Sequence, residues 1–220
     1  MTTRGAALQY LFIITYGRSG STLLQGILNA IPGYLVRGEN RESVYHLYRF
    51  HRTCTDEARR VRRSDGRLLP VTHPFFGMDS FPADRSLELL RGLVTETLLR
   101  PGPDTRVSGF KEIRWHQEDL REFVAFLRQV FPGARFIVNT RDHEAVLASA
   151  FWRAKPRDGR LERAESAMLE LSTGLGDAAY RLHYDDYVSD ISHLDELFAW
   201  LGEPFDPTTV RDVMSVRHSY

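Results

Sequence analysis

The sequence contains very little cysteine and no long apolar run. Cys54 is the only cysteine among 220 residues, which excludes an intrachain disulfide and favours a reducing compartment. No stretch reaches the ~20 apolar residues that a membrane-spanning helix needs. The apolar run at 8–16 lacks the small-residue cleavage site of a signal peptide. We therefore expect a cytoplasmic protein without a membrane span.

The chain also has few lysines and a formal net charge of zero. Its 29 basic residues balance 29 acidic residues, which argues against general nucleic-acid binding. Lys111 and Lys155 are the only lysines, so a lysine at the end of a predicted strand suggests a need for a compact point charge. Residues 49–67 hold seven arginines against three acids, and residues 177–206 hold eight acids against one arginine. The basic stretch is either a solvated helix face or a surface that receives an anionic acceptor.

Short runs rich in β-branched and aromatic residues alternate with helical segments along the chain. The predicted strands are 8–16, 34–37, 106–110, 135–140 and 179–184. Apolar spacing predicts amphipathic helices through 120–131 and 191–201. Strands that alternate with helices are typical of a parallel α/β sheet. We therefore expect one three-layer α/β domain over residues 1–220, with helices on both faces of a central parallel sheet.

The sharpest local pattern is the segment YGRSGSTLL at 16–24, which joins the first predicted strand to a helix. Gly17 and Gly20 allow backbone angles closed to other residues and let a ligand approach the main chain. A helix N-terminus attracts anions, and Arg18 adds a planar fork of donors suited to phosphate or sulfate oxygens. The hydroxyls of the loop belong to Ser19, Ser21 and Thr22. This strand–loop–helix predicts a P-loop-like cradle for a phosphate-type anion.

The same loop lacks residues that two other enzyme classes require. A nucleotide triphosphatase reads G-x-x-x-x-G-K-[ST], and no lysine follows Gly20. A serine-hydrolase elbow reads G-x-S-x-G, and position 21 is serine rather than glycine. The loop is therefore suited to holding an anion without the usual machinery for ATP.

The segment TYGRSGSTLL resembles the phosphosulfate loop of sulfotransferases that use 3′-phosphoadenosine-5′-phosphosulfate (PAPS). The resemblance implies that residues 17–22 bind the 5′-phosphosulfate. A second stretch, ARFIVNTRDHEAVLASAFW at 134–152, is similar to the family's 3′-phosphate site. It implies that Arg141 and Ser149, eight residues apart on one helix face, bind the 3′-phosphate. The alternative is that Arg141 pairs locally and that Ser149 is an ordinary helix residue.

Two further elements resemble the tyrosylprotein and carbohydrate branch of this family. The segment GYLVRGENRE is similar to the element that carries the catalytic base, which implies that Glu39 is the base. The segment VSGFKE is similar to the element that carries a lysine for the transition state, which implies that role for Lys111. The alternatives are that Glu39 is a solvated charge near a helix N-terminus, and that Lys111 is a surface lysine paired with Glu112.

Other residues near these motifs have less definite roles. His116 is the alternative base, because another branch uses a histidine shortly after the equivalent lysine. The segment RLHYDDYV at 181–188 resembles a strand that carries an aromatic residue near the nucleotide. Tyr184 is therefore either a nucleotide contact or core packing. The chain lacks the family's R-K-G-x-x-G element, and Arg217 and Ser219 are the candidates to replace it.

The resemblance implies a metal-independent enzyme that moves a sulfuryl group in line from PAPS to an acceptor hydroxyl and releases 3′-phosphoadenosine-5′-phosphate (PAP). Arg18, Glu39 and Lys111 are then the catalytic residues. The expected acceptor is a glycan, a lipid or a small molecule, with residues 41–84 as the acceptor-binding region, and a homodimer is one way to complete its pocket. Two alternatives stay open: a P-loop kinase in which Asp142 holds magnesium, and a module that binds PAP without turnover.

Overall fold

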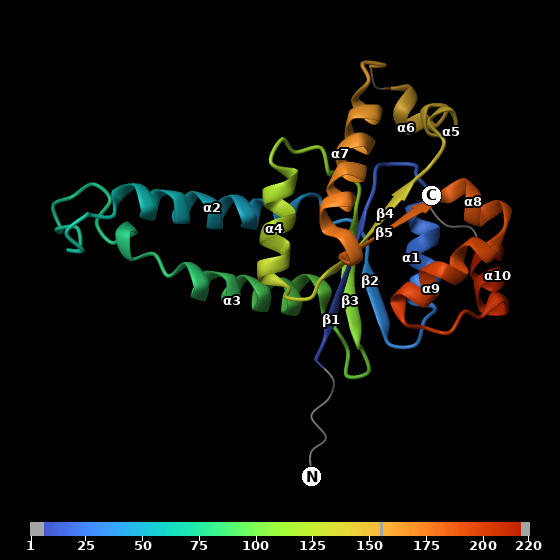
Figure 1. Ribbon diagram of the computed structural model, residues 1–220, viewed down its shortest axis with the longest axis horizontal. Helices are drawn as coiled ribbons and strands as arrows, with labels where there is room; N and C mark the ends of the chain where they lie inside the picture. The colour runs from blue at the N-terminus through green and yellow to red at the C-terminus, as the bar shows by residue number, and fades with distance from the viewer. Residues whose placement is uncertain (1–6, 155, 217–220) are drawn as a thin grey trace, which may run out of the picture.

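Five parallel strands form the central sheet of the computed structural model, which describes residues 7–154 and 156–216. The strands are β1 (Gln9–Ile14), β2 (Tyr34–Arg37), β3 (Val107–Glu112), β4 (Arg135–Thr140) and β5 (Ala179–His183). They pair in the order β2-β3-β1-β4-β5, which places β1 between β3 and β4 (Figure 1). The prediction of a parallel α/β sheet is confirmed, and every predicted strand agrees with an observed strand to within two residues at each end.

Helices lie on both sides of this sheet (Figure 1). They are α1 (Ser21–Asn29), α2 (Ser43–Val61), α3 (Ala83–Val94), α4 (Leu120–Val130), α5 (His143–Leu147), α6 (Ala150–Arg153), α7 (Arg160–Leu175), α8 (Tyr184–Ser189), α9 (Asp195–Leu201) and α10 (Pro207–Ser215). Shorter helical turns are η1 (Met78–Ser80), η2 (Thr95–Leu99), η3 (Gly176–Ala178) and η4 (Ile191–Leu194). Among the described residues, no helix combines the length and the apolar character needed to cross a bilayer.

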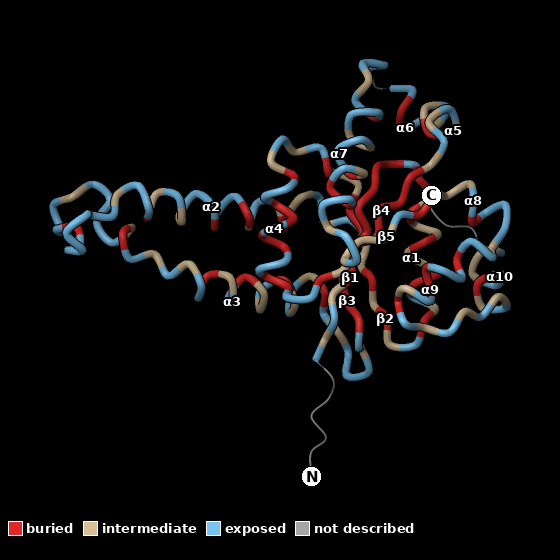
Figure 2. The backbone as a smooth tube through the Cα atoms, in the orientation of Figure 1, coloured by how far each residue is buried: buried red, intermediate tan, exposed pale blue. Residues whose placement is uncertain are grey.

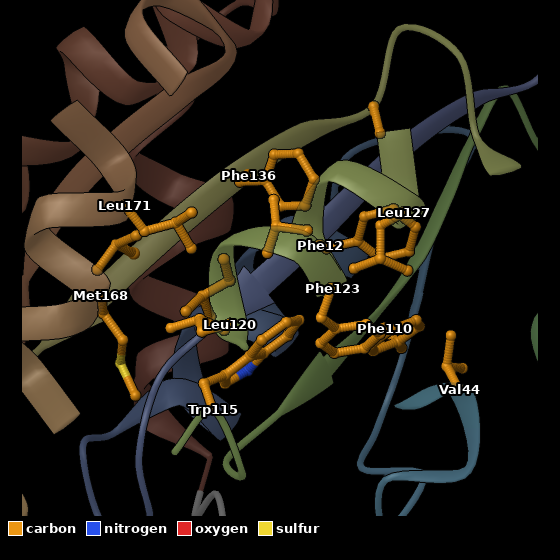
Figure 3. Close-up of a cluster of buried hydrophobic side chains, with 14 of the residues drawn as sticks. Phe12, Val44, Phe110, Trp115, Leu120, Phe123, Leu127, Phe136, Met168 and Leu171 are labelled. Carbon is orange, nitrogen blue, oxygen red and sulfur yellow. The ribbon is translucent and has the colours of Figure 1, made fainter. Parts of the chain in front are cut away.

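The strand β1 supplies side chains to two separate cores, because successive residues of a strand point to opposite faces. Phe12 and Ile14 belong to a cluster with α2, α3, α4 and α7. Figure 3 shows part of this cluster, in which Phe12 and Phe110 lie near the aromatic side chains of α4 and the loop before it. Leu11 and Ile13 belong to a second cluster with α1, α8, α9 and α10. The three-layer arrangement therefore follows from the alternation along the strands.

The helices α2 and α3 form an arm that projects from the sheet (Figure 1). Its outer half is largely exposed (Figure 2), and Leu68 and Val71 in the connecting loop are 70% and 76% exposed. The two helices are joined by buried contacts such as His51 with Ser86, whose Nδ1 and Oγ lie 3.2 Å apart. The predicted acceptor region 41–84 is mostly this arm, which begins next to the loop that carries Glu39 and leads away from it.

Candidate active site

A cavity of about 540 Å³ lies where β1, β3 and β4 end. Its walls are Gly17, Arg18, Gly20, Ser21, Thr22, Leu23, Glu39, Lys111, Ile113, Arg141, Phe151, Tyr184, Met214 and Val216. Most of the site residues predicted from the sequence are therefore brought together, whereas Ser19 and Ser149 are not in the wall. Crevices at the carboxyl ends of parallel strands, next to a central strand, are the usual ligand sites of open α/β sheets.

The loop between β1 and α1 has the geometry of an anion site. Gly20 has φ of 76°, and a Cβ there would lie 1.9 Å from the Tyr184 ring. Arg18 also has a positive φ, 72°, and its exposed side chain forms no hydrogen bond or ion pair with the described residues. No side chain caps the N-terminus of α1, and its first turn has no acidic residue. The free amides of this helix start and the guanidinium of Arg18 are thus available to an anion.

The side chain of Ser19 is not part of the cavity wall. It is completely buried, and its hydroxyl lies 2.6 Å from the hydroxyl of Thr15. Thr15 donates its own hydrogen to the carbonyl of Asn139 at 2.7 Å, so Ser19 is the donor in that pair. The Asn139 side chain in turn donates to the Ser19 carbonyl at 2.9 Å. The Ser19 side chain therefore fastens the loop to β4 rather than facing the cavity.

Glu39 and Lys111 form an ion pair in the cavity wall. Lys111 Nζ lies 2.8 Å from Glu39 Oε1, and Arg114 Nη1 lies 3.9 Å from Glu39 Oε2. The Lys111 side chain is 6% exposed, whereas that of Glu39 is 34% exposed. The alternative, in which Lys111 is a surface lysine paired with Glu112, is therefore excluded. A carboxylate open to the cavity beside a buried ammonium provides a proton acceptor and a positive charge at one point.

Arg141 follows β4 and reaches back over the phosphate loop. Its guanidinium lies 4.4 Å from the centre of the Tyr184 ring, and its Nη1 donates to the Arg18 carbonyl at 3.2 Å. Its Nε lies 3.8 Å from Asp185 Oδ1 and has no hydrogen-bond partner among the described residues. Tyr184 lines the cavity and also packs against the second core cluster, so both of its predicted roles are compatible with its position.

Tyr16 positions Arg141, a role that the sequence motifs did not indicate. The Arg141 amide donates to the Tyr16 hydroxyl at 2.8 Å, and that hydroxyl lies 2.6 Å from Glu165 Oε2. Burial, followed by the hydrogen bond to Glu165, raises the pKa of Tyr16 far above its ordinary value. The phenol is therefore a neutral donor to Glu165 throughout the physiological range, which fixes the backbone of Arg141.

Three other predicted residues lie outside the cavity wall. The helix after β4 is interrupted between α5 and α6, so Arg141 and Ser149 do not share one helix face, and the Ser149 hydroxyl donates to the Val146 carbonyl at 2.6 Å. His116 is exposed and is not part of the wall. The Asp142 carboxylate accepts from the Ala145 amide at 3.0 Å and caps α5. Arg217 and Ser219 lie outside the described residues.

The wall also contains apolar residues to which the sequence motifs assigned no role. They are Leu23, Ile113, Phe151, Met214 and Val216. Phe151 contacts the phosphate loop so closely that a Cβ on Gly17 would lie 2.6 Å from its ring. The neighbouring Trp152 donates its indole N–H to the Gly17 carbonyl at 2.7 Å. No group of three or more His, Cys, Asp or Glu residues suited to a metal ion occurs in the described part of the chain.

Comparisons with known proteins agree with this geometry. Residues 10–207 match the sequence profile of the sulfotransferase family. No curated protein sequence matches the chain. The fold resembles the sulfotransferase domain from the curacin biosynthetic pathway, with a TM-score of 0.53, 16% identity, and coverage of 93% of this chain and 77% of that one. It also resembles the sulfotransferase domain of the Synechococcus PCC 7002 olefin synthase, with a TM-score of 0.51, 20% identity, and coverage of 99% and 81%.

The two solved structures establish the fold, and the profile match covers nine-tenths of the sequence, from the second residue of β1 to the first residue of α10. The match therefore includes the phosphate loop, the strand end with Lys111 and the strand end before Arg141. On these grounds the chain belongs to the sulfotransferase family.

Proposed function

We propose that the protein transfers the sulfuryl group of PAPS to a hydroxyl of a glycan, a lipid or a small molecule. One observation carries this proposal: a single cavity is lined by an uncapped helix N-terminus, by Arg18 and Arg141, and by the Glu39–Lys111 pair. The first two features suit a doubly phosphorylated donor, and the pair suits proton removal from an acceptor. Kinship with the tyrosylprotein and carbohydrate branch stays a prediction.

The donor is held by two anion sites. Arg18 and the amides at the start of α1 bind the 5′-phosphosulfate, because a helix N-terminus and a guanidinium both favour multiple oxyanion contacts. Arg141 binds the 3′-phosphate, since its Nε has no hydrogen-bond partner among the described residues and its guanidinium is already oriented by Tyr184. Ser149 joins this site only if its hydroxyl leaves the Val146 carbonyl.

In the transfer step, Glu39 accepts the proton of the acceptor hydroxyl. The acceptor oxygen forms a bond to sulfur while the bond from sulfur to the bridging phosphate oxygen breaks. The electron pair of that bond stays on the 5′-phosphate of PAP. Lys111 and Arg18 stabilise the charge on the sulfuryl and bridging oxygens, because fixed positive groups act where charge develops. In the free protein Lys111 neutralises Glu39, so the incoming sulfuryl group competes for the same ammonium.

The kinase alternative is less well supported by the site. It requires a lysine in the loop and an aspartate for magnesium near it. The loop has no lysine, and the carboxylate of Asp142 caps α5 instead of lining the cavity. The module that binds PAP without turnover differs from the proposed enzyme in two respects. It releases no PAP from PAPS, and the Glu39→Gln change leaves its binding of PAP unaltered.

Thermal unfolding with PAP and with ATP–magnesium tests the donor. A ligand that binds only the native state stabilises it by about 2.7 kcal/mol at a hundred times its Kd. We expect PAP to raise the Tm, and Arg141→Ala to remove that rise. Arg128→Ala is the matched control, because Arg128 is exposed on α4 and remote from the cavity wall. A rise with ATP–magnesium and none with PAP refutes the proposal. PAP release from PAPS, lost in Glu39→Gln, separates the enzyme from the binding module.

A further inference from the structure

Glu112 ends β3 one residue after Lys111, and its side chain is almost completely buried. Adjacent residues of a strand point to opposite faces of a sheet. Lys111 accordingly faces the cavity, whereas Glu112 is absent from the cavity wall and only 5% of its side chain is exposed. A buried carboxylate is costly unless hydrogen bonds compensate it, so its partners indicate what it does.

Both oxygens of the Glu112 carboxylate accept hydrogen bonds from main-chain amides. Oε2 lies 3.1 Å from the amide of Asn40 and 3.2 Å from that of Glu42. Oε1 accepts from the Ile113 amide at 2.8 Å. Two of these three donors belong to the loop after β2, and the first of them directly follows Glu39. The carboxylate thus ties that loop to the end of β3.

The loop after β2 has a conformation that requires such support. Arg41 and Glu42 have φ of 53° and 65°, which is the left-handed region in two successive residues without a glycine. Turns of this kind gather main-chain amides on one side, where they bind an anion. In this protein the anion is the Glu112 carboxylate. The strained turn and the buried charge therefore stabilise each other.

Two neighbours hold this arrangement in place. Arg114 Nη1 lies 3.5 Å from Glu112 Oε1 and 3.9 Å from Glu39 Oε2, so one guanidinium lies between the two carboxylates. The indole of Trp115 donates to the Glu112 carbonyl at 2.7 Å. Trp115 is completely buried in the cluster of Figure 3 and stacks on Phe123 with 5.5 Å between ring centres. The backbone of Glu112 is thus anchored in the core.

We propose that Glu112 is a positioning residue for the proton acceptor of the transfer reaction. Lys111 holds the Glu39 carboxylate from the cavity side, and Glu112 holds the backbone directly after Glu39 from behind. One strand end therefore fixes both the side chain and the main chain of the base. This inference rests on the proposed function only in assigning Glu39 as the base; the contacts of Glu112 are independent of it.

The change Glu112→Gln tests the inference with little alteration of shape. The side-chain oxygen of the glutamine can still accept from a main-chain amide. Its NH₂ group replaces the other oxygen and faces either the two loop amides or the Ile113 amide, from which it cannot accept hydrogen bonds. We expect faster hydrogen exchange at the Asn40 and Glu42 amides and unchanged PAP binding. The kcat for PAPS hydrolysis, in which water replaces the acceptor, should fall by about 10²-fold, the cost of a catalytic group displaced by ~1 Å.

A double variant separates positioning from a general structural role. If Glu112 acts only through Glu39, then Glu39→Gln combined with Glu112→Gln is no slower than Glu39→Gln alone. Glu118→Gln is the matched control, because Glu118 is exposed just before α4 and forms no hydrogen bond or ion pair with the described residues. Multiplicative losses in the double variant, or loss of PAP binding in Glu112→Gln, contradict the inference.

Failure of this inference is distinguishable from failure of the proposed function. Unchanged exchange at the Asn40 and Glu42 amides in Glu112→Gln refutes the inference, whatever the activity. Faster exchange with unchanged kcat refutes it as well. A wild-type protein that neither binds PAP nor releases it from PAPS refutes the proposed function instead, and the exchange comparison then decides whether Glu112 holds the loop.

Discussion

Unfavourable backbone conformations in the described residues are concentrated beside the cavity. Arg18, Arg41 and Glu42 are three of the four non-glycine residues with positive φ. Such conformations persist only where the surroundings hold them, and they cluster at functional sites. Here the side chain of Asn139 holds the phosphate loop, and Glu112 holds the loop after β2. The loops that carry Arg18 and Glu39 are thus preorganised at a cost in stability.

Arg18 offers a direct test of this cost. Arg18→Gly and Arg18→Ala both remove the guanidinium, so each should lower the PAPS turnover rate by about 10²–10³-fold, as the loss of one oxyanion donor does. Glycine tolerates the φ of 72°, whereas alanine retains the strain of about 1–2 kcal/mol. The glycine variant should therefore have the higher Tm of the two by differential scanning fluorimetry. An alanine variant that equals or exceeds it contradicts the assigned strain.

Gly20 is expected to be irreplaceable for a further reason. Gly20→Ala adds both the strain of a left-handed alanine and a clash, because its Cβ would lie 1.9 Å from Tyr184. Gly202→Ala is the matched control, since Gly202 has a similar φ of 79° and open space around its Cβ position. Both variants should lose about 1–2 kcal/mol of stability from strain. Only Gly20→Ala should also lose PAP binding by isothermal titration, and equal affinities in the two variants would exclude the clash as a determinant.

At the scale of elements, the sequence predicts structure that a local pattern encodes, but it does not predict structure that depends on contacts between distant parts of the chain. The strands were predicted closely because each is a short apolar run, and the loop after β1 was recognised from its glycines. The break between α5 and α6 was not predicted. It directs Phe151 and Trp152 onto Gly17, more than 130 residues earlier in the chain. No local signal in the sequence encodes that contact, and the same holds for the hydrogen bonds of Glu112.

The short helix α6 is therefore expected to act as a support for the phosphate loop. Trp152→Phe preserves an aromatic ring but leaves the Gly17 carbonyl without its indole donor. A buried group left without its partner costs about 1–3 kcal/mol, so both the Tm and the affinity for PAP should fall. Trp200→Phe is the control, because the Trp200 indole bonds to the Asp177 carbonyl at the surface. An affinity for PAP that is the same in both variants would show that α6 does not shape the loop.

At the scale of the whole molecule, the site is assembled where the two cores meet at the sheet. Glu39, Lys111 and Arg141 lie at or just after the carboxyl ends of three different strands, so the order of the parallel strands already brings them to one edge of the sheet. The contribution of the C-terminal segment was not predicted, because Met214 and Val216 reach the cavity through the packing of α10 on α1. Such packing depends on the complete fold and has no motif.

Buried tyrosines in several elements should determine how steeply the fold loses stability at high pH. Burial raises the pKa of Tyr187 in α8, with a smaller contribution from Tyr184, and burial together with Glu203 raises the pKa of Tyr34 at the start of β2 to about 12. A pKa that is higher in the folded state contributes stability that is complete below the unfolded value near 10 and is lost as the pH rises through the folded value. Each such tyrosine then removes about 1.4 kcal/mol per pH unit above pH 10.

Tyr187→Phe isolates one of these groups. Among the described residues the Tyr187 hydroxyl makes only one hydrogen bond, a long one of 3.4 Å to Asn139 Oδ1, so the change should cost little at pH 7.5. Between pH 10 and 11, however, the free energy of unfolding of the variant should fall less steeply than that of the wild type, by the contribution of one tyrosine. Urea unfolding at a series of pH values measures both slopes, with Tyr10→Phe as the control because Tyr10 is only partly buried in β1. Equal slopes for the wild type and Tyr187→Phe would mean that folding does not raise the pKa of Tyr187, and the loss of stability at high pH would then belong to other groups.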